Sequence, residues 1–194
     1  MKKLSVTISL ILSAAFAIPA IAQTTPPTTW EVAAGYNFVH ANAPPTGCGC
    51  FSMNGGSASA LRQFNPALGL VGEFNGATNN KVDSAGHSLT LLTYLVGPRY
   101  RFAPSRGRFG PFAQILIGGA HASGGLYAAS GSLSGTANAF AASMGGGVDV
   151  APNSRLSLRL VQAEYLLTLL PNAVNSRQNN FNLTTGVAIH FGAR

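Results

Sequence analysis

The segment from Phe181 to Phe191 constrains the fold more than any other part of the sequence. One set of alternate positions is large or apolar, and the other set is small or polar. The first set is Phe181, Leu183, Thr185, Val187, Ile189 and Phe191, and the second is Asn182, Thr184, Gly186, Ala188 and His190. Because successive side chains of a strand point to opposite faces, this pattern predicts a β-strand with one apolar face. A strand of a soluble sandwich would show the same alternation as a strand of a barrel, so only the rest of the chain can distinguish the two folds.

The N-terminus has the pattern of a secretory signal peptide. Lys2 and Lys3 precede an apolar run, and Ala20-Ile21-Ala22 provides a small-x-small cleavage site before Gln23. A membrane anchor is the alternative, but Pro19 interrupts the apolar run and no basic stop-transfer cluster follows. We therefore expect residues 1–22 to be a signal peptide and residues 23–194 to form a single domain.

The composition is apolar on balance and poor in charge. Charged residues make up 9% of the chain, about a third of the usual share. No cluster of Lys and Arg interleaved with aromatic residues appears, so we expect no nucleic-acid partner, and we also expect no cofactor. No segment after the leader is long and apolar enough for a membrane helix. A closed barrel is the other structure that satisfies every backbone group in lipid.

Eight segments of the mature chain are compatible with strands. We place them at Trp30–Ala41, Gly55–Gln63, Ala67–Ala77, Ser88–Phe102, Phe109–Ala122, Asn138–Val150, Arg155–Leu170 and Asn180–Phe191. The connections alternate between long ones (42–54, 78–87, 123–137, 171–179) and short ones (64–66, 103–108, 151–154). Long external loops and short periplasmic turns are typical of outer-membrane barrels. The sequence therefore predicts an all-β, eight-stranded antiparallel up-and-down transmembrane β-barrel.

Most charged residues fall inside these segments, where a soluble protein would place few of them. On the lipid face at mid-membrane a charge would cost about 2–4 kcal/mol, so we expect them to face the lumen. The predicted interior network comprises Glu31, Asn37, Glu73, Arg99, Arg101, Gln114, Asp149, Arg159, Gln162 and Glu164. Its role is either a polar plug that fills the lumen or a selectivity element, and the narrowness of an eight-stranded barrel favours the plug.

Simple alternation fails at three places. The second segment shows no clean phase, and Pro98 and Pro111 fall in neighbouring strands, where a shared bulge would accommodate both. In the seventh segment, Arg159 and Glu164 can both face inward only if the strand slips by one residue. We therefore predict a β-bulge within Leu160–Ala163.

Aromatic residues gather near the ends of the predicted strands, as the two aromatic girdles of a membrane barrel require. The ends joined by short turns carry Trp30, Phe64, Tyr100, Phe102, Phe109 and Phe191, and the opposite ends carry Phe38, Phe74, Phe140, Tyr165 and Phe181.

With these features assembled, residues 23–194 resemble the small outer-membrane barrels of the OmpA, OmpX and opacity-protein type. The short stretches that carry the resemblance are Gly56-Ser57-Ala58-Ser59-Ala60, Gly97-Pro98-Arg99-Tyr100, Pro111-Phe112-Ala113-Gln114 and Gln162-Ala163-Glu164-Tyr165. The resemblance implies contact with outer-membrane lipid and lipopolysaccharide, and insertion by an assembly machinery that recognises the last strand. Gly192-Ala193-Arg194 follow the terminal aromatic, where the family usually ends on it. We expect a monomer with a structural or surface-interaction role.

Cys48 and Cys50 lie in the first long connection. In an oxidising compartment they could form a small strained disulfide within the loop, or pair with another chain. Free thiols are the second interpretation. A redox or metal role is the third, and it is disfavoured because no His or acidic residue lies near them. No metal site is expected.

Two other classes of function remain. His121 and Ser123 have the His-x-Ser spacing of a lipid A deacylase, although Gly124 follows where Asn would be expected and no acid lies close in sequence. The other class is a secreted soluble barrel that binds a small hydrophobic ligand. It would place apolar side chains inside and polar ones outside, the reverse of our assignment.

Overall fold

The fold consists of eight strands and no described helix. The computed structural model describes residues 29–41, 51–81, 88–102, 108–127, 133–171 and 176–192. The strands are β1 (Trp30–Ala41), β2 (Phe51–Gln63), β3 (Leu68–Asn79), β4 (Leu89–Arg101), β5 (Phe109–Tyr127), β6 (Leu133–Val150), β7 (Leu156–Thr168) and β8 (Gln178–Phe191). Among the described residues, no helix is long and apolar enough to cross a membrane. Residues 1–22, the predicted signal peptide, lie outside the described part of the chain.

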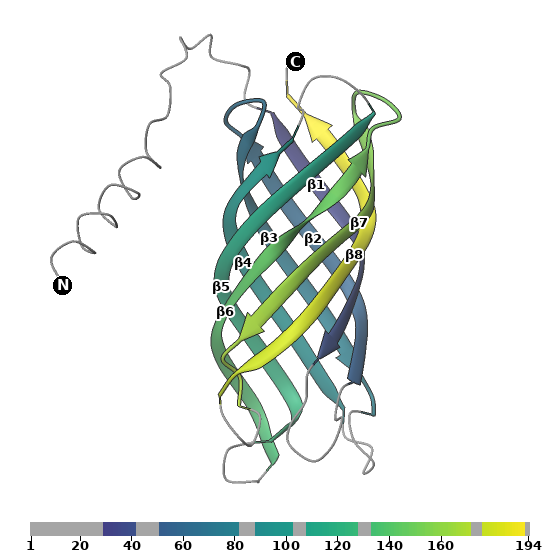
Figure 1. The fold of residues 1–194 in the computed structure, drawn as a ribbon. Coiled ribbons are helices and arrows are strands. Elements are labelled where there is room, and N and C mark those ends of the chain that lie inside the picture. Colours follow the sequence, from purple (N-terminus) through teal and green to yellow (C-terminus); the bar gives the residue numbers. More distant parts are fainter. Residues whose placement is uncertain are drawn as a thin grey trace, which may run out of the picture.

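The strands form one closed antiparallel barrel in which each strand pairs with its sequence neighbours. β1 closes the barrel against β8, with Trp30 opposite Phe191 and Ala41 opposite Asn180. Figure 1 shows the strands tilted around the barrel axis, with the short turns gathered at one end together with the start of β1 and the end of β8. We call this end the turn end and the opposite end the loop end. The predicted fold class is confirmed.

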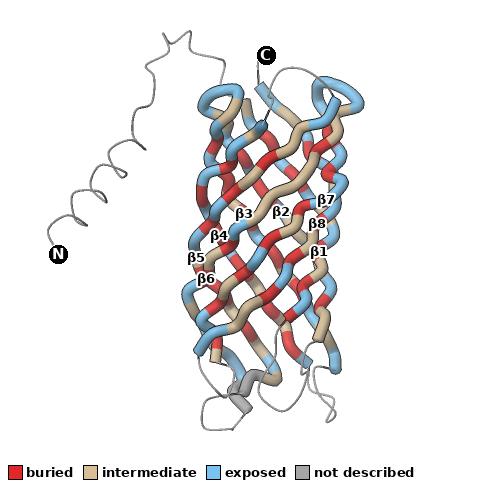
Figure 2. Tube along the Cα trace, viewed as in Figure 1, coloured by how far each residue is buried: buried red, intermediate tan, exposed pale blue. Residues whose placement is uncertain are grey.

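Buried residues alternate with more exposed ones along most of each strand (Figure 2). The exterior is apolar all around the barrel, with Val32, Leu70, Tyr94, Ile117 and Met144 among its exposed side chains. All four described acidic residues are buried inside. An apolar exterior that surrounds buried charges is the opposite of what a soluble ligand-binding barrel requires.

Several strands extend further towards the loop end than the sequence predicts. β2 begins at Phe51, β5 runs to Tyr127 and β6 starts at Leu133, so residues 123–137 are not a loop throughout. The pairing of β5 with β6 shifts register between Ser123 and Leu126. Gly124 lies there with a φ of 110°, a left-handed conformation that glycine adopts without a steric penalty. This bulge allows the hairpin to continue beyond the point where the apolar pattern ends.

β2 does have a clean phase, which the sequence analysis missed. Met53, Ser59 and Leu61 are buried, and the even-numbered residues between and beside them face outward. The outward positions include the small Ala58 and Ala60, so the two faces differ little in polarity.

The expected bulge shared by Pro98 and Pro111 was wrong. β4 and β5 pair in the same register on both sides of Pro98, with Val96 opposite Ile117 and Arg99 opposite Gln114. Gly97 and Pro98 make no described pair with β5, so the ladder is interrupted there without a slip. A local interruption is sufficient because proline removes only one donor.

The bulge predicted in β7 is confirmed. Val148 pairs with Val161, but the next residue, Asp149, pairs with Arg159. Leu160 and Val161 are consequently both exposed, while Arg159 and Glu164 are both buried. The extra residue turns both charged side chains away from the lipid.

Candidate functional site in the barrel interior

Glu31 of β1 is the centre of an ionic cluster at the turn end. Its Oε1 accepts hydrogen bonds from Arg99 Nη1 at 3.1 Å and Arg159 Nη2 at 3.0 Å. Its Oε2 accepts one from Arg101 Nη2 at 2.9 Å. Arg159 also donates from Nε and Nη2 to the two oxygens of Asp149, at 2.9 and 3.1 Å. The cluster therefore links β1, β4, β6 and β7 across the lumen, and buried guanidinium groups of this kind need such partners.

Two further carboxylates lie deeper and are linked by amide side chains. Gln114 Nε2 donates to Glu73 Oε2 at 3.1 Å and to Glu164 Oε1 at 2.7 Å. Gln162 Nε2 donates to Glu73 Oε2 at 2.8 Å. Gln114 Oε1 in turn accepts from Arg99 Nε at 2.7 Å, which joins this pair to the ionic cluster. Glutamine suits this position because one amide both donates and accepts.

Three polar residues that the sequence analysis missed complete the bonding of the two carboxylates. Asn75 donates to Glu73 at 2.8 Å, and Ser143 donates to Glu164 at 3.1 Å. Asn182 lies 3.4 Å from Glu164. Asn75 and Ser143 share strand parity with the predicted interior residues Glu73 and Asp149, and Asn182 lies on the small or polar face of the last strand; that parity was the signal available in the sequence.

Phe112 is the interior residue that was least expected. Two guanidinium groups lie over its ring, with Arg99 Cζ 4.4 Å and Arg159 Cζ 4.9 Å from the ring centroid. A ring face attracts a cation, so Phe112 stabilises both arginines. A Cβ added at Gly147 would lie 2.4 Å from the backbone oxygen of Val161 and 2.8 Å from Cζ of Phe112, so only glycine fits beside β7 and the ring. Phe112 has the parity of Gln114, and that parity alone would have placed it inside.

The loop-end half of the interior is apolar, which corrects the expectation of an ionic lumen throughout. Buried apolar side chains gather there: Val39, Ala41, Met53, Ala77, Leu89, Leu91, Ala120, Ala122, Leu166 and Leu170. Leu61, Val71, Leu95 and Leu116 continue the cluster along the wall formed by β2 to β5. A prediction built on charged residues could not find this region, because the region contains no charged residue. The only signal was the apolar residues at the strand positions that face inward.

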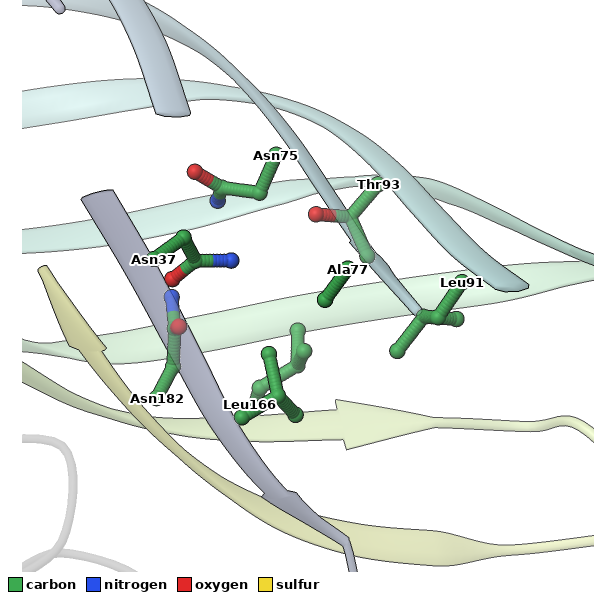
Figure 3. Close-up of a pocket in the computed structure, with 8 residues that line it drawn as sticks. Asn37, Asn75, Ala77, Leu91, Thr93, Leu166 and Asn182 are labelled. Carbon is green, nitrogen blue, oxygen red and sulfur yellow. The ribbon is translucent and has the colours of Figure 1, made fainter. Parts of the chain in front are cut away.

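A narrow gap separates the two halves (Figure 3). Asn37, Asn75, Thr93 and Asn182 line it together with apolar residues of the loop-end cluster, and the gap does not admit a water-sized sphere. Asn37 Nδ2, Asn75 Oδ1, Thr93 Oγ1 and Asn182 Oδ1 are buried there, and none of them has a hydrogen-bond partner among the described residues. Asn75 and Asn182 direct their NH₂ groups to the carboxylates and thus leave their oxygens to this gap.

The structure places nine of the ten predicted interior residues among the buried side chains, and the tenth, Arg101, is 24% exposed and bonded to Glu31. Asn37 is joined to the interior bonds by the Thr184 hydroxyl, which donates to Asn37 Oδ1 at 3.2 Å. Cys48 and Cys50, the predicted loop disulfide, lie outside the described residues. Within the described ranges, no group of three or more His, Cys, Asp or Glu residues is arranged to hold a metal ion.

His121 faces outward near the loop end of β5. One of its ring nitrogens, Nδ1, lies 2.7 Å from Asn138 Oδ1 on β6. No described hydrogen bond joins His121 to Ser123. All four described carboxylates are buried in the lumen, so none of them can orient this histidine.

Comparison with known proteins identifies the architecture. A family profile described as outer membrane protein beta-barrel domain matches residues 8–191. No curated protein sequence matches the chain. Among solved structures, neisserial surface protein A is 20% identical with a TM-score of 0.64, and the match covers 84% of this chain and 97% of that one.

Two more solved barrels are similar in fold. The attachment invasion locus protein Ail of Yersinia pestis is 14% identical with a TM-score of 0.59, over 86% of this chain and all of that chain. The outer membrane protein OprG of Pseudomonas aeruginosa is 12% identical with a TM-score of 0.56, over 87% and 98% of the two chains. At these identities the likeness establishes the fold alone.

Proposed function

The chain belongs to the outer membrane protein beta-barrel domain family, and on that premise we propose that it is a closed, non-conducting barrel with a structural or surface-interaction role. It is a protein of the bacterial outer membrane, where such barrels lie in lipid and lipopolysaccharide. Insertion by the assembly machinery through β8, and a monomeric state, are parts of the same proposal.

The ion pairs in the interior are the observation that supports a closed lumen. Arg99, Arg159 and Glu31 meet from three strands, so their side chains occupy the lumen instead of lining it. Eight strands leave an interior just wide enough for side chains to fill. Beyond them, the apolar cluster fills the loop-end half, where ions would have to leave water behind.

Conductance in planar lipid bilayers tests the closed lumen. We expect the refolded protein to give no stepwise currents in 1 M KCl. We expect a variant that opens both halves, Glu31→Ala with Leu91→Ala and Leu166→Ala, to give currents if it still folds. Glu31→Ala alone, and Leu91→Ala with Leu166→Ala alone, should give no currents, because in each the unaltered half keeps the lumen closed. Steady currents through the unaltered protein, with an ion preference that changes in Asp149→Asn, would refute the proposal.

The surface role follows from the loop end, where the described exposed charges are Lys81 and Arg177. Ail, which has a similar fold, has been solved in complex with the heparin analogue sucrose octasulfate. We propose that the loop end of this barrel likewise contacts anionic groups at the cell surface, because cations exposed there attract them over a Debye length.

Binding of heparin to intact cells that display the protein tests the surface role. We expect binding that weakens with salt, and a clear loss of it in Lys81→Gln with Arg177→Gln. Arg108→Gln, at the opposite end, is the matched control and should bind as the unaltered protein does. Equal binding by cells that lack the protein would argue for a purely structural role.

A further inference from the structure

The charged side chains exposed on the described exterior are all positive. They are Arg62, Lys81, Arg108, Arg155 and Arg177. The four described acidic residues are all buried in the lumen, so none of them can neutralise this exterior charge. Among the described residues, the exterior of the barrel therefore carries only positive charge, although its interior contains both signs.

Three of these residues lie at the turn end, one beside each short turn. Arg62 is on β2 just before the first turn, Arg108 precedes β5, and Arg155 precedes β7. Because β2, β5 and β7 are spread around the barrel, the three arginines are distributed around its circumference. No hydrogen bond or ion pair to another described residue engages their guanidinium groups. We call these three residues the turn-end rim.

Arg62 is held at a defined depth by aromatic side chains. Its Cζ lies 5.7 Å from the ring centroid of Trp30 and 5.9 Å from that of Phe64. Both rings are exposed at the turn end, where Phe109, 66% exposed, adds a third. Aromatic side chains in such belts lie at the level of the lipid headgroups. The guanidinium beside these rings is therefore placed at the depth of the lipid phosphates, and its N–H groups remain available.

We propose that the turn-end rim binds the phosphate groups of anionic phospholipids. In outer-membrane barrels the short turns face the periplasm, and the leaflet on that side consists of phospholipid. A guanidinium donates two parallel hydrogen bonds to a phosphate, which a lysine cannot do. A phospholipid fits better than a soluble anion, because its acyl chains can cover the exposed aromatic rings beside Arg62.

Native mass spectrometry of the protein released from mixed micelles tests this proposal. The probes are phosphatidylglycerol, which is anionic, and phosphatidylcholine, which is zwitterionic. We expect phosphatidylglycerol to be retained preferentially. A cation near an anionic membrane surface is worth about fivefold in affinity, so Arg62→Gln should lose about fivefold, and the variant with all three rim arginines changed to Gln should lose the preference.

The control is His121→Gln, which changes an exposed polar side chain near the loop end and leaves every arginine and lysine in place. It should retain phosphatidylglycerol as the unaltered protein does. Folding is checked by circular dichroism, and exposed sites of this kind rarely affect it. Equal retention of both lipids by the unaltered protein, an unchanged preference in the triple variant, or an equal loss in the control would each overturn the proposal.

Discussion

The two halves of the barrel interior fill the lumen by different means. At the turn end, Glu31, Arg99, Arg159 and Asp149 fill the lumen with bonded charges. At the loop end, side chains such as Leu91 and Leu166 fill it by packing. Bonded charges fix which strands meet and in what register, because each buried charge needs its own partner. Apolar side chains only need to fill the volume, so they specify the structure less strictly.

The bulge in β7 shows what the ionic half requires of the backbone. Without the extra residue between Arg159 and Gln162, one of the two charges Arg159 and Glu164 would face lipid. A lipid-facing charge at mid-membrane costs about 2–4 kcal/mol. The apolar half places no such demand on the backbone, and the irregularity at Gly124, beyond which the β5–β6 pairing continues, serves no buried charge.

The largest effect is expected from Glu31→Ala. This change leaves Arg99 and Arg159 buried without the carboxylate that they share, and breaking a buried pair in this way typically costs about 3–5 kcal/mol. Urea unfolding in lipid vesicles would measure it, with fluorescence of Trp30, the single tryptophan, as the probe. Lys81→Gln, an exposed charge change, is the control. A loss below about 1 kcal/mol would show that the ionic half does not depend on this carboxylate.

In the apolar half, we expect Leu166→Ala to cost less. Removing a buried leucine costs about 2–5 kcal/mol, and the larger values belong to cavities that stay empty. Leu166 borders the gap that also contains the unpaired polar atoms of Asn37 and Thr93. The enlarged gap can accept a water molecule with polar partners, so the loss should lie near the lower limit.

Leu166→Met is the matched control for the apolar half. It conserves volume, and such changes cost less than about 1.5 kcal/mol. The same urea unfolding measures both variants. If Leu166→Ala destabilises the protein as much as Glu31→Ala does, the two halves do not differ in the way argued above.

A smaller effect is expected from Gly147→Ala at the turn end. The added methyl group would approach the backbone oxygen of Val161 to 2.4 Å and Cζ of Phe112 to 2.8 Å, so both the neighbouring strand and the ring would have to shift. Overpacking of this kind costs about 1–3 kcal/mol. Gly72→Ala is the control, because a Cβ at Gly72 meets no atom within 4 Å. Equal unfolding midpoints for the two variants would show that β7 and Phe112 accommodate the methyl group without cost.

The difference between the halves also explains which parts of the interior could be predicted from the sequence. Charged residues inside the predicted strands indicated the ionic half, because side chains such as Glu31 and Arg99 are too costly on the lipid face of a membrane barrel. Strand alternation could place the bulge near Arg159, because two charges of opposite parity had to share one face. Phe112 was missed because an aromatic residue in a membrane strand usually faces lipid, and only the cation pair around it gives a reason to bury it. The apolar half gave no signal beyond the parity of its residues, because leucine is favourable on both faces.

The smallest effect is expected outside the lumen, at His121. Its contact with Asn138 is on the exterior, so His121→Ala removes one exposed polar pair and leaves both halves of the interior intact. Exposed substitutions of this kind change stability by less than about 0.5 kcal/mol. We also expect no change in the acylation of lipid A, measured by mass spectrometry of cells that carry either form. A histidine that acts as a general base needs a hydroxyl within hydrogen-bond reach and a group that orients it, and of these His121 has only the amide oxygen of Asn138. Loss of acyl chains that depends on both His121 and Ser123 would instead make this exterior pair an active site and move the function from the lumen to the lipid-facing wall.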